Sequence, residues 1–537
     1  MSEPEEPTKS TPPAKPAAKR TAARKRTTAA KPSAAEPTAR EPRAPAPVQG
    51  ATPPPPDGPA PKVVPHPSVQ ERRTTGKEAR TRAPLSTHKT WEAASDRADP
   101  VALLEEQDRT READLVPVRH GRMLVSPFTF YRGAAKIMAA DLAETPTAGL
   151  LVQLCGDAHL SNFGMFASPE RRLLFDLNDF DETLPGPFEY DVKRMAASFT
   201  IAARNNAFPK ADQRDVTLIA ARTYREAMAS FAGMSTLDVW YAHLSEDDLR
   251  NVIGQAAKKA RKEGMSKKVV EKAEARSAAT FAKAHTRDSL QALSKLAEMV
   301  DGEYRIVSQP PVVIPLRDVA ALSGLSAEQV DAVIHDQFRA YRSTLQHDRR
   351  KLLERYRIVD AARKVVGVGS VGTRAFIALL EGRDEQDPLF LQVKEATASV
   401  LEDHLPKSRF KNPGERVVQG QRMMQAVSDI FLGWTKGLEQ GRFYYWRQLR
   451  DMKGSFEAEW MDTKALGLYA GVCAWTLARA HARSGDAVAI AAYLGSSDKF
   501  DRAIASFSER YADQNERDFE AFGAAVRSGR IEAVEGV

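Results

Sequence analysis

The centre of the sequence reads Leu150-Leu151-Val152-Gln153-Leu154-Cys155-Gly156-Asp157-Ala158-His159-Leu160-Ser161-Asn162. The apolar run at 150–154 has the length of a β-strand and ends near a glycine, and a second such run follows at 172–177. Directly after it comes the acidic stretch Asn178-Asp179-Phe180-Asp181-Glu182. The order predicts a strand, a polar loop, a second strand and an acidic loop. Polar groups this dense beside apolar strands are costly to bury unless they are paired or bind a ligand.

The spacing of these polar groups suits phosphoryl transfer. On one loop, Asp157 can orient a hydroxyl group or accept its proton, while Asn162 ligates Mg²⁺. A carboxylate after the second strand completes the metal site, and Asp179, Asp181 or Asp176 can fill that role. The alternative interpretation is a polar turn in which Asp and Asn side chains only cap the backbone.

A glycine-rich segment follows much later, at Gly367-Val368-Gly369-Ser370-Val371-Gly372. It lies between strand-like runs, not between a strand and a helix, which argues against a dinucleotide-binding fingerprint. Lys394 comes after a further strand-like run at 389–393. A glycine-rich hairpin over the phosphates, with a strand lysine behind it, forms the nucleotide clamp of kinases. An ordinary hairpin is the alternative.

Together these segments resemble the catalytic loop and metal-binding aspartate of kinase-like phosphotransferases, particularly the aminoglycoside and choline kinase branch. The resemblance implies that Asp157 is the catalytic base, with Asn162 and Lys394 also in the catalytic machinery. It implies Mg²⁺ bound by Asn162, Asp179 and Asp181. It also implies ATP bound by Gly367, Gly369, Ser370, Gly372, Lys394 and Glu415, with Glu415 as the ion-pair partner of Lys394. In kinases the glycine loop and lysine precede the catalytic loop, so the resemblance implies a two-lobed, circularly permuted protein-kinase-like fold.

The longer pattern is identified as that of a bacterial family, domain of unknown function 2252, over roughly residues 75–525. The family name implies no activity. The identification rests on these motifs: Arg122-Met123, Ser126-Pro127-Phe128, Arg132-Gly133, Gly156-Asp157-Ala158-His159, Asn178-Asp179-Phe180-Asp181-Glu182, Pro185-Gly186-Pro187-Phe188-Glu189, Asp191, Arg194, Gly367 to Arg374, Val393-Lys394-Glu395-Ala396 and Ala480-His481-Ala482-Arg483-Ser484-Gly485-Asp486.

Two other functions stay open from the residues alone. Asp157-Ala158-His159 also fits the opening motif of two-metal phosphoesterases. Neither a Gly-Asp-x-x-Asp nor a Gly-Asn-His motif follows it, which disfavours that class. A non-catalytic nucleotide-binding scaffold is the second alternative. The joint presence of a candidate base, candidate metal ligands and a strand lysine favours an enzyme, while the acceptor substrate stays unknown.

Composition separates a basic tail from a body that can fold. Residues 1–66 carry 11 Lys or Arg, 6 Asp or Glu and 17 of the 33 Pro, but no Leu, Ile, Phe, Trp or Tyr. A tail at 1–75 is therefore expected to be disordered, because it cannot bury enough apolar surface. The charge of +5 over residues 1–66 favours a solvated extension, and weak contact with nucleic acid or an anionic surface is the alternative.

The body is expected to be an α+β protein that is mostly helical. Its expected parts are a helical domain with the catalytic loop at 76–358, a nucleotide-binding lobe at 359–455 and a helical region at 456–537. Expected elements include helices at 127–142, 326–358 and 413–434, a strand at 444–449 and mostly helix from 462 to 528. Two Cys exclude a disulfide scaffold. The absence of a long apolar run or a secretory signal predicts a cytoplasmic protein with no membrane span.

Overall fold

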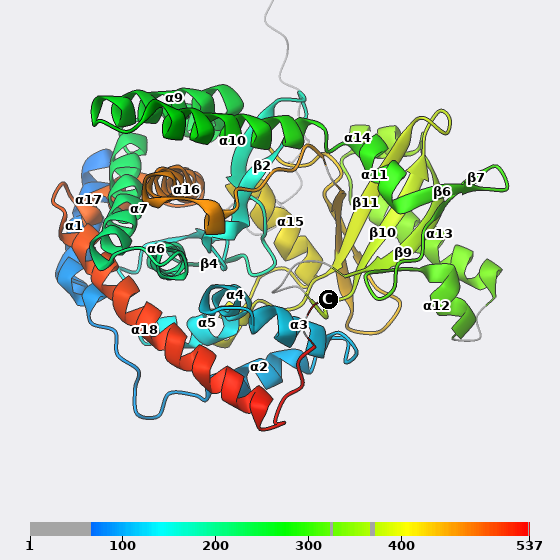
Figure 1. Cartoon of the computed structure of the whole chain (residues 1–537), viewed down its shortest axis with the longest axis horizontal. Coiled ribbons are helices and arrows are strands. Elements are labelled where there is room, and N and C mark those ends of the chain that lie inside the picture. The colour runs from blue at the N-terminus through cyan, green and yellow to red at the C-terminus, as the bar shows by residue number, and fades with distance from the viewer. Residues whose placement is uncertain (1–65, 323–325, 366–370, 450, 535, 537) are drawn as a thin grey trace, which may run out of the picture. The chain divides into compact units, whose positions relative to one another are not determined.

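The computed structural model describes residues 66–322, 326–365, 371–449, 451–534 and 536. Helices dominate the first and last parts of this range, and a β-sheet with flanking helices lies between them in sequence (Figure 1). The expected mixture of helices and strands, with helices in the majority, is confirmed.

Short helices lead to the first strand: α1 (Val69–Arg82), α2 (Pro100–Asp108), α3 (Val116–Met123), α4 (Pro127–Gly133) and α5 (Ala135–Ala143). Helix α1 begins inside the segment expected to be the tail, because Ser68 and Glu71 form a reciprocal capping box. The single helix expected at 127–142 is divided into α4 and α5. Gly133 packs directly on Met123, where a Cβ would lie 2.6 Å from the sulfur, and the chain turns at Ala134.

The two strands expected at 150–154 and 172–177 both form, but they do not pair with each other. Strand β1 (Leu151–Leu154) pairs antiparallel with β4 (Leu184–Pro187). Strand β3 (Leu173–Leu177) pairs antiparallel with β2 (Phe163–Ala167) and with β5 (Leu244–Ser245). Both polar stretches therefore lie on connections between small paired strands.

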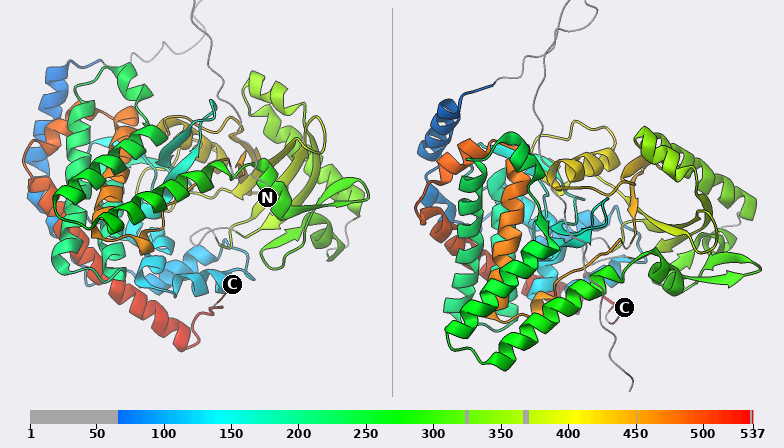
Figure 2. Two further views of the ribbon diagram at one scale, coloured as in Figure 1. Left: turned by 45° about the horizontal axis from the view of Figure 1, so that its top comes forward. Right: turned by 90° about the horizontal axis from the view of Figure 1, so that it is seen from above.

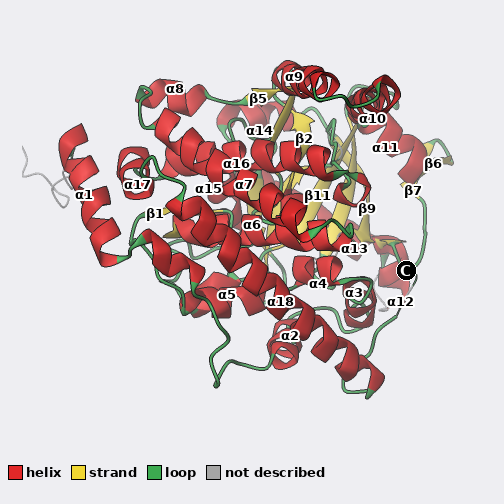
Figure 3. Ribbon diagram, turned by 60° about the vertical axis from the view of Figure 1, so that its left-hand side comes forward, coloured by secondary structure: helices red, strands yellow, loops and turns green. Residues whose placement is uncertain are grey.

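Helices, most of them long, form the main core. They are α6 (Phe188–Asn205), α7 (Lys210–Phe231), α8 (Thr236–Tyr241), α9 (Glu246–Lys262), α10 (Lys267–His285), α16 (Thr463–Ser484), α17 (Ala487–Leu494) and α18 (Lys499–Arg527). Helix α6 is buried along nearly its whole length, and α7, α16 and α18 pack around it (Figure 3). The mostly helical region expected from 462 to 528 is confirmed.

The middle of the chain contributes a six-stranded antiparallel sheet to the described residues. Its order is β12-β13-β11-β10-β9-β8. The strands are β8 (Val313–Pro315), β9 (Arg357–Lys364), β10 (Ala375–Glu381), β11 (Pro388–Glu395), β12 (Gly433–Lys436) and β13 (Phe443–Gln448). Helix α15 (Pro413–Met424) connects β11 to β12. The strands expected at 389–393 and 444–449 are confirmed, and both lie in the interior of the sheet.

Two expected helices are shorter than their sequence patterns indicated. The segment 326–358 contains α13 (Ala327–Ser343), α14 (His347–Leu353) and the start of β9. The helix is interrupted where the Thr344 hydroxyl accepts a hydrogen bond from Trp434 N of β12. The segment 413–434 is helical only to Met424. Beyond it, the Asp429 carboxylate accepts hydrogen bonds from the backbone N–H groups of Phe431 and of Gln448 in β13, which ties this part of the chain to the sheet. Packing against the sheet therefore overrides the local helical pattern.

Several small elements have no clear signal in the sequence. They are the hairpin of β6 (Ala297–Val300) and β7 (Glu303–Ile306), which follows helix α11 (Ser289–Leu296), and the helix α12 (Leu316–Leu322). Residues His66–Val537 form one compact unit, seen from two further directions in Figure 2. Within the described residues, no helix is long and apolar enough to cross a bilayer.

Candidate functional site

Asp157 lies on a tight loop directly after β1. The preceding Gly156 has a φ of +83°, and a Cβ there would overlap the carbonyl of Glu182, so this close approach requires glycine. Asp191 of α6 holds the loop in place. Its carboxylate accepts hydrogen bonds from the backbone N–H groups of Cys155 and Gly156 at 2.8 and 3.0 Å. The loop is therefore held at a defined position against the acidic stretch.

The Asp157 carboxylate is oriented by Arg194. Arg194 Nε donates to Asp157 Oδ1 at 2.8 Å, and the guanidinium lies 3.9 Å from the centre of the Tyr131 ring. Burial raises the pKa of Asp157 in spite of the Arg194 charge. His159 Nε2 lies 3.7 Å from Asp157 Oδ2, and burial lowers the pKa of His159, so its imidazole is neutral. A fixed orientation and a raised proton affinity suit a general base.

The acidic stretch after β3 brings two more carboxylates to the same place. Asp181 accepts hydrogen bonds from Lys394 Nζ at 2.6 Å and from the Tyr445 hydroxyl at 2.7 Å. Asp179 Oδ1 lies 3.7 Å from Lys394 Nζ. Burial and the charge of Asp181 raise the pKa of Asp179, whereas Lys394 and Tyr445 outweigh burial and lower the pKa of Asp181. One lysine therefore offsets the charge of a carboxylate pair.

Lys394 reaches this pair from β11, 213 residues further along the chain than Asp181. Its side chain is only 2% exposed. Burial disfavours its charge, but Asp179 and Asp181 outweigh that effect and raise the pKa of Lys394. The sheet thus delivers a buried, charged lysine to the acidic loop of the helical part.

The expected ion pair between Lys394 and Glu415 is not formed among the described residues. Glu415 lies in the first turn of α15, and its neighbour Arg416 reaches the site instead. Arg416 donates to the carbonyl oxygens of Thr183 and Asp181, at 2.7 Å each. The absence of this ion pair has a simple cause. The charge of Lys394 is already matched by Asp181, and α15 presents an arginine to the loop carbonyls.

The end of the glycine-rich segment also lies at this place. Four of its members fall outside the described residues: Gly367, Val368, Gly369 and Ser370. Gly372 has a φ of +86°, and its carbonyl accepts a hydrogen bond from Glu112 N at 2.7 Å. Arg111 donates to the Val371 carbonyl at 2.5 Å. The segment before α3 therefore anchors the end of the glycine-rich stretch.

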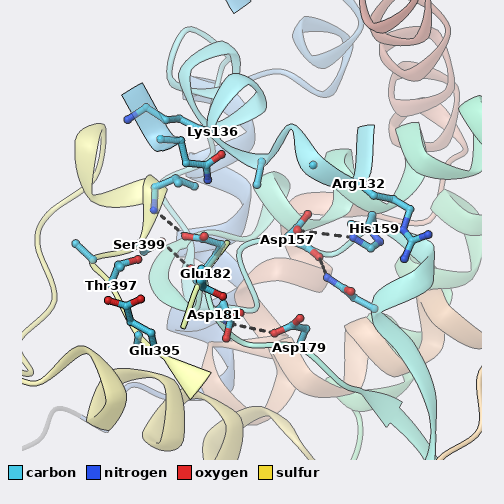
Figure 4. A pocket seen from close by; sticks show the side chains of 18 of the residues that line it. Arg132, Lys136, Asp157, His159, Asp179, Asp181, Glu182, Glu395, Thr397 and Ser399 are labelled. Carbon is cyan, nitrogen blue, oxygen red and sulfur yellow. Dashed lines mark hydrogen bonds and ion pairs between the residues drawn. The ribbon is translucent and has the colours of Figure 1, made fainter. Parts of the chain in front are cut away.

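A cleft of about 540 Å³ lies between these groups. It is lined by side chains from the loops after β1 and β3 and from the end of β11 and the segment that follows it. In Figure 4, Glu395, Thr397 and Ser399 lie towards one side of the view and Arg132 and His159 towards the other. Between them are the carboxylates Asp157, Asp179, Asp181 and Glu182. The cleft is therefore strongly acidic at its centre.

The oxygen atoms at this centre suit a hard cation such as Mg²⁺. Asn162 Nδ2 donates to the Asp157 carbonyl at 2.7 Å, and no described residue donates to Asn162 Oδ1. The Asp179 and Asp181 side chains are 32% and 28% exposed. No group of three or more His, Cys, Asp or Glu side chains among the described residues is arranged to hold a metal ion. A magnesium ion here would need additional oxygen atoms, such as those of a nucleotide phosphate.

Asp176, the third candidate for a metal ligand, has other partners. Its carboxylate pairs with Arg479 and accepts hydrogen bonds from the backbone N–H groups of Leu177 and Ala426 at 2.8 and 2.9 Å. The residue is 2% exposed and does not line the cleft. Its role is to join β3 to α16 and to the segment after α15.

Sequence reasoning missed several cleft residues. Burial raises the pKa of Glu182 to about 7, although Arg416 opposes the shift. Burial and the charge of Arg447 lower the pKa of Lys453 to about 7. Glu182 is part of the acidic stretch and could have been identified there. No local pattern marks Lys453, which lines the cleft, or Arg416, which contacts the acidic loop without lining the cleft. Both reach this place only through tertiary packing, and Arg416 lies 235 residues beyond Asp181 in the chain.

Comparisons with curated proteins and with solved structures find no match. A family model matches residues 111–525, a range that includes Asp157, Asp179 and Lys394. Since this range is most of the chain, the match identifies the family. The chain belongs to the family described as "uncharacterized protein conserved in bacteria", DUF2252.

Proposed function

We propose that this protein is a kinase-like phosphotransferase that uses ATP and Mg²⁺ to phosphorylate a hydroxyl group of an acceptor. In this proposal the six-stranded sheet is the nucleotide lobe and the helical part is the catalytic lobe, in permuted chain order. One observation carries the proposal: Lys394 Nζ of the sheet lies 2.6 Å from Asp181 Oδ2, in the acidic loop next to Asp157. Two segments that resemble a nucleotide clamp and a catalytic loop thus meet at one cleft.

Asp157 would accept the proton of the acceptor hydroxyl. The hydroxyl oxygen then forms a bond to the γ-phosphorus of ATP as the bond from that phosphorus to the β–γ bridging oxygen breaks, which leaves ADP. Arg194 keeps the Asp157 carboxylate oriented during this step, through its 2.8 Å hydrogen bond. Positioning and charge neutralisation supply most of the rate in such reactions.

Lys394 would bind the phosphates of the nucleotide. In the structure it pairs with Asp181, so a phosphate must share or replace that partner. The oxygen donors Asn162, Asp179 and Asp181 would hold Mg²⁺, which neutralises phosphate charge when bound. The raised pKa of Asp179 supports this assignment, because a nearby cation would relieve its repulsion from Asp181.

The test is transfer from γ-labelled ATP in the presence of Mg²⁺ and a metabolite extract, with Mg²⁺-nucleotide affinity measured by calorimetry. Wild-type protein is expected to bind the nucleotide and label one or more extract components. Lys394→Met should lose both properties. Lys436→Met is the matched control, because Lys436 is an exposed lysine on strand β12 of the same sheet. Absence of Mg²⁺-nucleotide binding would overturn the proposal, and binding without transfer would favour the scaffold.

A further inference from the structure

Most cations in and around the cleft already have partners. Lys394 pairs with Asp181, Arg194 with Asp157, and Lys136 with Asp403 at 2.8 Å and Glu106 at 3.3 Å. Other arginines of the region donate to described backbone carbonyls: Arg111, Arg416 and Arg447. A ligand that binds one of these cations must therefore share or replace the partner that the cation already has.

Arg132 differs from them. It lies in the last turn of α4 and lines the cleft, yet it forms no hydrogen bond or ion pair with any described residue, and its Nε is buried. Asp157 and the exposed Glu459 are the acids whose charges act on it, and neither lies within ion-pair distance. Leaving a guanidinium partly desolvated without a partner is unfavourable unless an anion completes its contacts.

Lys453 is a second cation of this kind. It follows β13, lines the cleft near Asn178 and Arg447, and forms no ion pair with the part of the chain that the structure describes. The acids that act on it are Asp429 and Asp179, and the repelling cations are Arg447 and Lys394. Its side chain is therefore also available to an incoming anion.

The position of Arg132 indicates which reactant it serves. In Figure 4 it lies next to His159, towards the same side of the view as Asp157 and away from Glu395, Thr397 and Ser399, which follow from the sheet. An acceptor hydroxyl must lie within hydrogen-bond reach of the base that takes its proton. A group bound at Arg132 would thus belong to the molecule that Asp157 activates and not to the nucleotide held by the sheet.

We propose that the acceptor is an anionic hydroxyl compound, bearing a phosphate or carboxylate group that Arg132 binds while Lys453 adds positive charge. The inference rests on the proposed phosphotransferase function and specifies its acceptor class. Arginine suits this role because its planar donors match the oxygens of phosphate and carboxylate. Arg132 would repel a cationic acceptor such as an amine, and Lys453 would add to that repulsion when it is protonated.

The test titrates inorganic phosphate into protein saturated with Mg²⁺ and a non-hydrolysable ATP analogue, with acetate and choline titrated in parallel. Phosphate or acetate should bind, and choline should not. Arg132→Met should weaken anion binding at least tenfold, and Lys453→Met by a smaller factor. Arg132→Lys should recover part of the loss. Arg73→Met, at an exposed position of α1, is the matched control and should bind as wild type does. Nucleotide affinity should stay within twofold in every variant.

Three results would overturn the inference: no anion binding by the nucleotide-saturated wild type, equal anion affinity in Arg132→Met, or tighter binding of choline than of both anions. A fall in nucleotide affinity in Arg132→Met would also overturn it, because Arg132 would then serve the nucleotide. Failure of the proposed function gives a different pattern. The protein would bind no Mg²⁺-nucleotide, while anion binding in its absence would still depend on Arg132.

Discussion

Two neighbouring aspartates, Asp176 and Asp179, are used in opposite ways. Asp176 is 2% exposed, and Arg479 and two backbone N–H groups occupy its carboxylate. The side chain of Asp179 is 32% exposed, and its nearest cation, Lys394, lies 3.7 Å away. The first carboxylate has partners on every side, whereas the second keeps oxygen atoms available to a ligand. The comparison shows that residue type and chain position alone do not distinguish a structural acid from a reactive one.

The same contrast holds between the helical core and the cleft. Glu189 of α6 is fully buried, and its Oε1 accepts a hydrogen bond from Ala148 N at 2.7 Å. Burial raises the pKa of Glu189 to about 7 and lowers that of Lys193, one helical turn later, to about 8. Charges in the core are closed off from solvent. Asp157, Asp179 and Asp181 are partly open to it, so ligands can reach them.

The largest expected effect is on the rate. Asp157→Asn should reduce phosphoryl transfer at least about 100-fold, because an amide cannot accept the hydroxyl proton. Mg²⁺-nucleotide affinity should change less than about twofold, since Asp157 acts on the acceptor. Rates from labelled ATP and affinities from calorimetry check both statements. Full turnover in Asp157→Asn would show that Asp157 is not the catalytic base, and the cleft acid would then have no chemical role that the core acids lack.

Asp176→Asn should affect stability instead. It leaves the Arg479 guanidinium buried without its charged partner, which typically costs about 3 kcal/mol or more. Urea unfolding measures the loss. Asp179→Asn is the matched control and should not destabilise the protein, because it removes repulsion from Asp181. Equal stabilities of the two variants would contradict the assignment of Asp176 to structure.

Glu189 predicts a pH dependence of stability. Its folded pKa is raised to about 7, chiefly by burial, so its contribution to stability is present below the unfolded value and is lost as pH rises through about 7. The variant Glu189→Gln does not lose stability in this way as the pH rises, because a glutamine side chain does not ionise. Its stability relative to wild type should rise by about 2 kcal/mol between pH 5 and pH 7. Glu144→Gln, at an exposed position nearby, should give no such trend in urea unfolding. A flat difference for Glu189→Gln would show that folding does not raise the pKa of Glu189.

The smallest expected effect is on the metal site. Asp179→Asn should weaken Mg²⁺-nucleotide binding about tenfold, because it removes one charged oxygen ligand while Asp181 and Asn162 remain. Nucleotide binding without Mg²⁺ should be unchanged or slightly tighter, since a negative charge has been removed. Calorimetry with and without Mg²⁺ separates the two effects. Equal loss in both conditions would mean that Asp179 holds the loop and not the metal.

Local patterns predicted some elements well and others poorly. The strands at 150–154 and 389–393 have apolar runs with clear ends, and both form. The pattern at 326–358 predicted one helix, but contacts with β12 divide it, and its last residues join the sheet as β9. The small hairpin β6–β7 was not predicted, because strands this short depend on their neighbours more than on their own composition.

The sequence by itself determined the local chemistry: which loop carries Asp157 and Asn162, which stretch carries Asp179 and Asp181, and that a lysine ends a strand later in the chain. Strand length, glycine and polar spacing act over a few residues, so they can be read directly. Only the tertiary structure decided that Lys394 pairs with Asp181 and not with Glu415, that Arg416 contacts the acidic loop, and that Asp176 is a structural residue. Those outcomes depend on how the sheet packs against loops that are more than 200 residues away in sequence. They also depend on burial, which exists only in the folded protein and sets the proton affinity of each group.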